Sequence, residues 1–255
     1  MLELIDVTKK FNGVAVVNRL GFRVCPGEVV GYLGPNGAGK STTVKMLAGL
    51  LEQNSGRILC DGRPIMEDYV SYKSKIGYVP EQGELYTHLT GLEYLQLVGR
   101  LRGIPEALLF TKITGILEVM GLTYEIYLSI SGYSKGMKQK VLIAAALLHD
   151  PDILLLDEPL SGLDVSTMLI LKDLFQLLSN NGKIIIYSSH VLDVVEKVCR
   201  RVIILNKGRV VADDSVDGLG HLMKCPSLES IFRQLVQQQD TAGASKKIHA
   251  FMTAC

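Results

Sequence analysis

The segment between residues 34 and 42 holds the side chains with the clearest chemical purpose. Its sequence, Gly-Pro-Asn-Gly-Ala-Gly-Lys-Ser-Thr, matches G-x-x-x-x-G-K-[ST], the pattern of a phosphate-binding loop. Glycines let the backbone curl around an anion, and the N–H groups of the loop and of the following helix then face the phosphates. Lys40 should reach the β- and γ-phosphates of a nucleotide, and the Ser41 hydroxyl should ligate magnesium. The nucleotide ligands expected here are Gly34, Pro35, Asn36, Gly37, Ala38, Gly39, Lys40, Ser41 and Thr42.

The residues on both sides of this loop supply the context that the pattern requires. An apolar run at residues 29–33 precedes it, and a helical pattern over residues 40–51 follows it. A strand, a loop and a helix in this order form the setting in which the pattern binds phosphate. An ordinary glycine-rich turn requires neither a preceding strand nor a following helix, so these neighbours favour the phosphate-binding interpretation.

Two adjacent acids follow a second apolar strand, at residues 153–156. We expect this strand to lie next to the one that precedes the loop. Asp157 at its tip is then placed to hold magnesium. Glu158 comes beside the γ-phosphate, where it could orient or deprotonate an attacking water. The two segments together indicate nucleotide hydrolysis.

Residues 206–209, Asn-Lys-Gly-Arg, approach the N-K-x-D pattern that reads guanine in GTPases. Arg209 stands where that pattern requires an aspartate. We interpret the segment as a hairpin turn, because no other pattern in the sequence indicates guanine binding.

The remaining pattern predicts an α/β fold with a helical block inserted into it. The spacing of apolar residues is helical from about residue 89 to 149. Predicted strands and helices alternate before and after that block. The predicted strands are 2–7, 14–18, 22–24, 28–33, 57–60, 76–79, 153–156, 183–188, 202–205 and 209–212, and the later helices are 165–178 and 191–198.

Composition narrows the class of protein. The 255 residues are 47% hydrophobic and 21% charged, and the net charge of +1 gives no electrostatic reason to expect nucleic-acid binding. Five scattered cysteines form no CxxC pair, so neither a disulfide framework nor a zinc site is indicated, and a reducing cytosol is the simplest setting. The N-terminus does not have the pattern of a signal peptide, and no apolar run reaches the length of a membrane span.

The C-terminal part reads as a separate unit. Apolar residues at 228, 231, 232, 235 and 236 predict an amphipathic helix, capped by Ser227, that packs on the core. We expect the chain to fray beyond Asp240.

Over residues 1–236 the chain resembles the ATP-binding subunit of an ABC transporter. Besides the loop and the acid pair, the helix opening at residues 133–139, Tyr-Ser-Lys-Gly-Met-Lys-Gln, matches the signature segment of that family. This Y-S-K-G-M form is similar to that of exporter ATPases that serve drugs, antibiotics, polysaccharides or gliding machinery. Residues 161–164 match the D-loop, His190 matches the switch histidine, and Phe11 matches the aromatic position that stacks on adenine.

The resemblance implies a P-loop NTPase core of the RecA-like kind, with an N-terminal antiparallel β subdomain and an inserted α-helical subdomain. It implies an ATP-binding domain over residues 1–222, with its helical subdomain at about 85–150, and a C-terminal helix and flexible tail over 223–255. ATP and magnesium are the implied cofactors.

The resemblance also implies partners. Two such subunits pack head to tail, so that Ser134 and Gly136 of one chain complete the ATP site of the other. Asp164 of the D-loop also belongs to the implied ATP site, and His190 contacts the γ-phosphate. Taken alone, a serine and a glycine at a helix start are a routine cap. Two integral membrane subunits would hold the dimer at the cytoplasmic face of the inner or plasma membrane as a peripheral protein, and no nucleic acid is implied.

One departure from the family pattern concerns the residue after the strand at 76–79. The family carries a glutamine there that senses magnesium and the attacking water. Here Pro80 is followed by Glu81 and then Gln82. Glu81 could fill the role as an anion, or Gln82 could do so after a small shift, and the sequence leaves both open.

Three functions are consistent with these residues. The first is a transporter motor, an exporter by resemblance, with an importer as the alternative. The second is a soluble ABC module in translation or DNA repair, which the single cassette, the lack of a long coiled-coil insertion and the near-neutral charge disfavour. The third is a regulatory switch that binds ATP without hydrolysing it, suggested by Glu81 and the variant signature.

Overall fold

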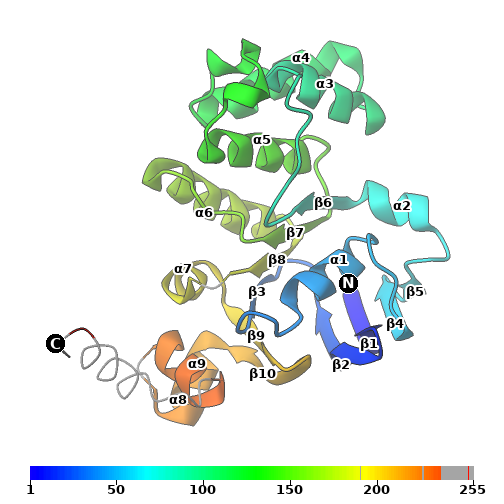
Figure 1. The fold of residues 1–255 in the computed structure, drawn as a ribbon, viewed down its shortest axis with the longest axis vertical. Coiled ribbons are helices and arrows are strands. Elements are labelled where there is room, and N and C mark those ends of the chain that lie inside the picture. Colours follow the sequence, from blue (N-terminus) through cyan, green and yellow to red (C-terminus); the bar gives the residue numbers. More distant parts are fainter. Residues whose placement is uncertain (190, 226, 237–251, 253–255) are drawn as a thin grey trace.

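The computed structural model describes residues 1–189, 191–225, 227–236 and 252. A central sheet, a smaller sheet near the N-terminus and a block of helices at the opposite end make up this part of the chain (Figure 1). The predicted fold class, an α/β P-loop core with an antiparallel β part and a helical part, is confirmed.

The central sheet has six strands in the order β10-β9-β3-β8-β7-β6, and only the β9–β10 pair is antiparallel. Because β8 separates β3 from β7, the expectation that the strand ending in Asp157 is the direct neighbour of the strand before the loop is wrong. The strands are β3 (Val29–Leu33), β6 (Ile76–Val79), β7 (Ile153–Asp157), β8 (Ile184–Ser188), β9 (Arg201–Asn206) and β10 (Arg209–Ser215).

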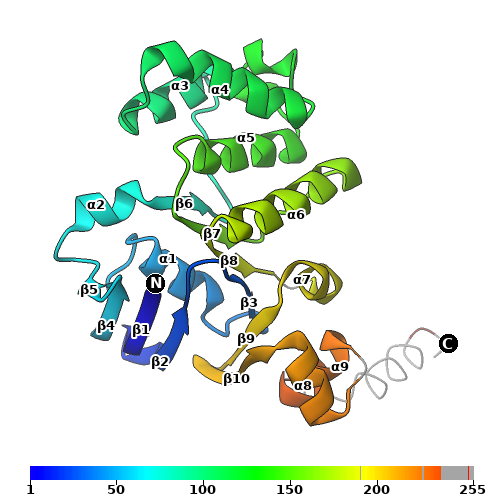
Figure 2. The same cartoon turned by 180° about the vertical axis from the view of Figure 1, so that it is seen from behind.

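Helices cover both faces of this sheet, which Figures 1 and 2 show from opposite sides. Val30 and Tyr32 of β3 belong to the same core cluster as the buried residues of α1 (Lys40–Leu47). Leu33 belongs to the other cluster, together with α6 (Val165–Asn180) and α7 (Leu192–Val198). Two-sided burial explains why the central strands are continuous apolar runs instead of alternating patterns.

The smaller sheet is antiparallel, in the order β2-β1-β4-β5. Its strands are β1 (Leu2–Phe11), β2 (Val14–Val24), β4 (Ser55–Cys60) and β5 (Arg63–Pro64). The prediction of two strands at 14–18 and 22–24 is wrong, and β1 runs four residues past the predicted end. Asp6 and Arg19 take positive φ angles of 48° and 51°, and the register shifts beside them. Such bulges let a strand continue through a segment whose pattern suggests a break.

Helix α1 ends at Leu47 instead of at the predicted residue 51. Gly49 has a φ angle of +65°, and the N–H of Leu50 donates to the carbonyl of Lys45 at 2.9 Å. This closure by a left-handed glycine ends a helix even where apolar residues continue its period.

The helical block contains α3 (Gly91–Leu101), α4 (Glu106–Val119) and α5 (Lys135–Leu147), with short 3-10 turns η1 (Glu125–Tyr127) and η2 (Ile130–Gly132) between the last two. The side chains of Thr90 and Glu93 form a capping box that starts α3. Leu95, Leu109 and Ile113 are fully buried between the helices. A short helix, α2 (Tyr69–Ser74), precedes β6.

Two helices close the described chain, α8 (Val216–Met223) and α9 (Leu228–Val236). Leu228 and Ile231 are buried, and α9 packs against α7 and α8, so the predicted amphipathic helix on the core is confirmed. The Ser227 hydroxyl accepts from the N–H of Ser230 at 3.3 Å, as its predicted cap role requires. The fraying expected beyond Asp240 concerns residues outside the described part.

Within the described residues, every helix is too short or too polar to cross a membrane.

Candidate functional site

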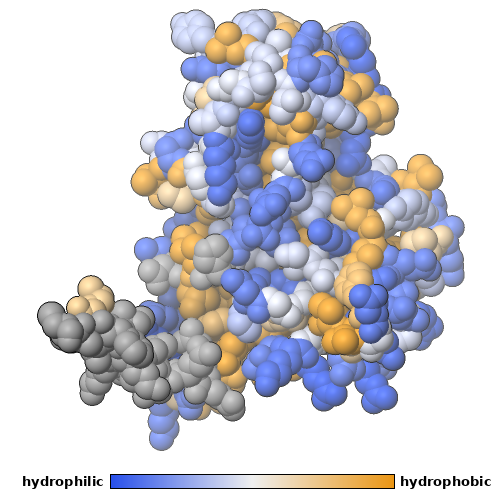
Figure 3. Space-filling model, viewed as in Figure 1, coloured by the Kyte–Doolittle hydropathy of each residue, from blue (hydrophilic) through white to orange (hydrophobic). Residues whose placement is uncertain are grey.

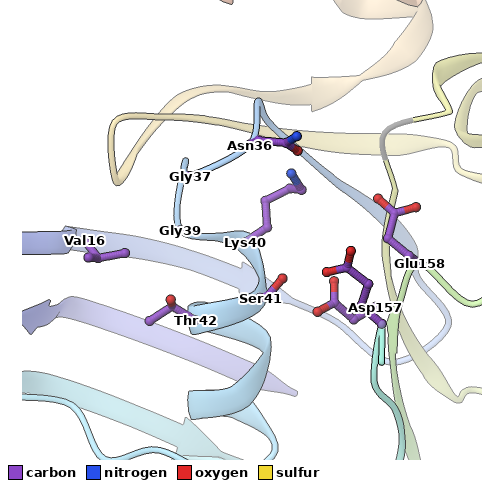
Figure 4. A pocket seen from close by; sticks show the side chains of 10 residues that line it. Val16, Asn36, Gly37, Gly39, Lys40, Ser41, Thr42, Asp157 and Glu158 are labelled. Atoms are coloured by element: carbon purple, nitrogen blue, oxygen red, sulfur yellow. The ribbon is translucent and has the colours of Figure 1, made fainter. Parts of the chain in front are cut away.

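A pocket of about 530 Å³ lies at the carboxyl edge of the central sheet, where β3 and β7 end. Figure 4 shows the side chains of Lys40, Ser41, Asp157 and Glu158 pointing into one space. Its volume falls within the usual range for small-molecule sites. The described residues that line it are Val16, Asn36, Gly37, Gly39, Lys40, Ser41, Thr42, Glu81, Asp157 and Glu158.

The phosphate-binding loop keeps its shape because two neighbouring segments press against it. Gly39 has a φ angle of +103°, and a Cβ there would lie 2.8 Å from the carbonyl oxygen of Val16 in β2. A Cβ on Gly34 would lie 2.6 Å from the carbonyl oxygen of Leu205 in β9. The N–H of Gly208, in the β9–β10 turn, donates to the carbonyl of Ala38 at 3.0 Å. This turn is the segment that approaches the guanine pattern, and here it supports the loop.

Lys40 is the cation among the described residues that line the pocket, and it is 9% exposed. Its Nζ donates to the carbonyl oxygens of Gly34 at 2.7 Å and Pro35 at 3.3 Å. Burial lowers the pKa of Lys40, while the negative charges of Glu158, Asp157 and Glu81 act in the opposite direction. An incoming phosphate would replace two neutral carbonyl partners with an anion, which forms the stronger charge-assisted hydrogen bond.

Asp157 ends β7 with its side chain 2% exposed. Its Oδ1 is buried and has no hydrogen-bond partner among the described residues. The Ser41 hydroxyl faces it across the pocket (Figure 4). A buried carboxylate oxygen that lacks a protein partner, opposite a hydroxyl, fits the oxygen ligands that Mg²⁺ prefers.

Glu158 follows Asp157 with a φ angle of 51°, which is uncommon for a residue with a side chain. Its N–H donates to the carbonyl of Ser188 at 2.9 Å, and its Oε2 accepts from the Ser189 hydroxyl at 3.2 Å. Ser188 ends β8 and Ser189 follows it, so this end of the strand helps to hold Glu158 in the wall of the pocket.

Glu81 and Gln82, the two candidates for the role of the family's glutamine, line different hollows of the structure. Glu81 lines the phosphate pocket. Gln82 lines a different hollow, a groove of about 870 Å³ between α2, α3 and α5.

This separation leads to a prediction about Glu81 and Gln82. Glu81→Ala should lower kcat for ATP hydrolysis by about 10-fold or more, because it removes a pocket side chain that can position water. Gln82→Ala should leave kcat of the isolated protein within about twofold, since its side chain faces the groove. Phosphate release by the two variants at saturating ATP checks this. The reverse order of effects would assign the role to Gln82.

Three other sequence candidates, Ser134, Gly136 and Asp164, lie outside this pocket in their own chain. Among the described lining residues, none comes from α5. Ser134 caps that helix by accepting from the N–H of Met137 at 3.2 Å, and Gly136 sits in its first turn. Asp164 caps α6, and the hydrogen bond from Lys140 lowers the pKa of the Asp164 carboxyl. His190 lies outside the described residues.

The sequence predicts Phe11 as a residue of the nucleotide site, but in the structure Val16 lines the pocket and Phe11 does not. Phe11 is 46% exposed beneath Lys9, whose Nζ lies 5.3 Å from the ring centroid, and it does not line the described pocket. Val16 does line it. Sequence reasoning missed Val16 because an apolar strand residue carries no chemical signal. Its role depends on β2 lying beside the loop.

A family model described as ABC transporter matches residues 17–161. The chain is 37% identical over 238 residues to the ABC transporter ATP-binding protein NatA of Bacillus subtilis, covering 91% of this chain and 96% of that protein. It is 34% identical over 218 residues to the Nod factor export ATP-binding protein I of Paraburkholderia xenovorans, covering 86% and 70%.

Two solved structures share the fold. The structure of an ATP-binding subunit of an ABC transporter superposes with a TM-score of 0.86 and 32% identity, over 92% of this chain and 99% of the other. The dimeric structure of a post-hydrolysis state of the ATP-binding cassette MJ0796, bound to ADP and Pi, gives a TM-score of 0.75 and 26% identity, over 84% and 98%.

Proposed function

Since the chain belongs to the ABC transporter ATP-binding proteins and is an ATPase, we propose that it is the motor subunit of an exporter. The observation that carries the motor role is the pocket in which the buried Lys40 of the phosphate-binding loop lies among three acids, Glu81, Asp157 and Glu158. Names of relatives such as the Nod factor export protein and the linearmycin resistance protein favour export over import. An importer remains the alternative.

In the proposed reaction each pocket residue acts on a defined atom. Lys40 binds the β- and γ-phosphates, and the loop N–H groups hold their oxygens. Ser41 and Asp157 would hold magnesium, with Glu81 close by, and the ion would neutralise charge on the phosphates. Glu158 accepts a proton from the water that attacks the γ-phosphorus, so that the bond to the β-phosphate oxygen breaks and ADP leaves.

A second copy would complete the site. Ser134 and Gly136 stand at the start of α5 and line no part of the described pocket in their own chain. If they bind phosphate, the phosphate must come from another subunit. Helix N-termini suit this role because their N–H groups and dipole favour anions. We therefore propose a head-to-tail dimer in which these two residues close the partner's pocket, while Asp164 and His190 remain proposed ATP-site residues.

The groove beside the pocket suits a membrane subunit. It is lined by apolar Leu50, Val70 and Leu101, each more than half exposed, and by basic Lys73 and Arg102. Figure 3 shows apolar residues around α2, one of several places where apolar residues reach the surface on this face. Exposed apolar clusters of this kind mark interaction sites. We propose that a cytoplasmic segment of the membrane subunit docks here, which holds the protein peripherally at the cytoplasmic face of the membrane.

The groove and the pocket are joined by consecutive residues. Glu81 lines the pocket and Gln82 lines the groove. A movement of Glu81 caused by hydrolysis of the γ-phosphate would therefore also move Gln82, and through it the docked segment. The helical block, proposed as a subdomain at about 85–150 within an ATP-binding domain of residues 1–222, supplies the other wall of the groove through α3 and α5.

Co-purification tests this proposal. Tagged protein isolated from detergent-solubilised membranes of its native host should bring down an integral membrane protein. Val70→Asp with Lys73→Glu should reduce recovery of that protein by about 10-fold or more, since interface anchors commonly contribute over 1 kcal/mol each. Lys112→Glu on exposed α4 is the matched control.

Other results of this experiment have defined meanings. Ribosomes or DNA recovered in place of a membrane protein would favour a soluble module. A membrane protein recovered equally with the groove variant would place docking elsewhere. ATP binding by the groove variant should match that of the unmodified protein, because the substitutions lie outside the phosphate pocket.

A further inference from the structure

Gln139 is a buried polar side chain beside the nucleotide site that the proposed reaction does not use. It lies in α5 and is 6% exposed. Its Nε2 donates to the carbonyl oxygen of Pro159 at 2.9 Å. Pro159 directly follows Glu158. Because proline lacks an N–H group, its carbonyl is the only backbone polar group through which this residue can be held.

The same face of α5 holds the rest of the segment that follows Glu158. Lys135 Nζ donates to the Ser161 hydroxyl at 3.0 Å. A Cβ on Gly136 would lie 2.6 Å from the carbonyl oxygen of Gly162, so helix and segment touch through their backbones. These contacts leave little room for the segment to approach α5 more closely.

The far end of the segment is anchored as well. Lys140 pairs with Asp164 at 2.8 Å, and Asp164 caps α6 through the N–H of Thr167. Positions 135, 136, 139 and 140 lie within one face of the helix. Helix α5 therefore contacts the segment at residues 159, 161, 162 and 164, along most of its length.

Glu158 needs such support. Its φ angle of 51° is unfavourable for a residue with a side chain, and such conformations persist only where the surroundings hold them. Contacts from Ser188 and Ser189 hold Glu158 from the side of β8. On the side of the following residue, Gln139 donates a buried side-chain hydrogen bond to the Pro159 carbonyl.

We propose that Gln139 is a positioning residue for ATP hydrolysis, which fixes the direction of Glu158 by holding the Pro159 carbonyl against α5. The inference rests on the proposed role of Glu158 as the base. It makes the direction of the base depend on the position of α5, a helix whose own start lies outside the pocket.

The test is Gln139→Met, which keeps length and packing but removes the donor. The kcat for phosphate release should fall about 10-fold while KM for ATP stays within about twofold, because a misplaced catalytic group costs rate more than binding. Gln176→Met is the control, since Gln176 is exposed on α6 and its Nε2 donates to Oδ1 of Asn180 at 3.1 Å. An unchanged kcat for Gln139→Met, or an equal rise in KM, would overturn the inference.

A double-mutant cycle separates this inference from the proposed function. If Gln139 acts through Glu158, Gln139→Met should leave the residual turnover of Glu158→Gln unchanged within about twofold. A further 10-fold fall in that background would show that Gln139 acts elsewhere. Full turnover by Glu158→Gln alone would instead remove the proposed base, and this inference with it.

Amide hydrogen exchange tests the contact between Gln139 and the segment after Glu158 without measuring ATP hydrolysis. The N–H groups of Ser161 and Leu163 are protected by turns within the segment. Gln139→Met should speed their exchange about fivefold or more, while the amides of β7 stay protected. Equal exchange in both proteins would mean that the hydrogen bond does not hold the segment.

Discussion

Glu158→Gln should lower ATP hydrolysis by about 100- to 10,000-fold, the range that a positioned general base contributes. The substitution removes the proton acceptor and keeps the shape. The amide oxygen of the substituted side chain can still accept from the Ser189 hydroxyl, which lies 3.2 Å from Oε2 of Glu158 in the unmodified protein. ATP binding should persist within about threefold, because Lys40 and the loop make the phosphate contacts.

Light scattering of the same variant tests the proposed dimer. Its mass should double with ATP and magnesium, and stay monomeric with ADP or without nucleotide, since slow hydrolysis keeps the closed state occupied. Glu118→Gln, on the exposed face of α4, is the control and should hydrolyse normally. Retained turnover by Glu158→Gln would rule out its role as base. A monomer that binds ATP tightly would rule out self-dimerisation.

How far the sequence predicts this site depends on how local each feature is. The phosphate-binding loop was predictable residue by residue, because its pattern encodes both backbone freedom and the lysine in nine consecutive positions. The predicted strand, loop and helix all form, although Gly49 ends the helix early. The pattern could not reveal this, since the apolar period continues through Leu50 and Leu51.

Features that depend on distant contacts were harder to predict. The order of strands places β8 between the loop strand and the strand that carries Asp157, and nothing in either segment encodes that. The choice between Glu81 and Gln82 depended on which direction each side chain takes after β6. Val16 lines the pocket because β2 packs directly against the phosphate-binding loop at Gly39.

Buried hydrogen bonds are the least predictable class. By resemblance Gln139 belongs to the signature segment at residues 133–139, but its hydrogen-bond partner is a carbonyl 20 residues away. The fold creates such contacts by packing two segments together, so a single sequence carries no signal for them.

Asp157→Asn should make the enzyme nearly inactive for a different reason from Glu158→Gln. The asparagine keeps the size of a side chain that is 2% exposed, but it halves the oxygen ligands and removes the charge. We expect kcat to fall roughly 100-fold or more, since a bound metal contributes several kcal/mol to charge stabilisation at the phosphates. Phosphate release across a magnesium titration measures this.

Binding measurements separate metal loss from a damaged fold. With a chelator present, Asp157→Asn and the unmodified protein should bind ATP equally, because the loop and Lys40 are intact. Added magnesium should tighten ATP binding in the unmodified protein and have at least 10-fold less effect in the variant. Asp152→Asn is the matched control: Asp152 precedes β7 at its other end and pairs with Lys183 on the surface. Equal magnesium responses in Asp157→Asn and Asp152→Asn would mean that the unpartnered Oδ1 of Asp157 does not face the metal.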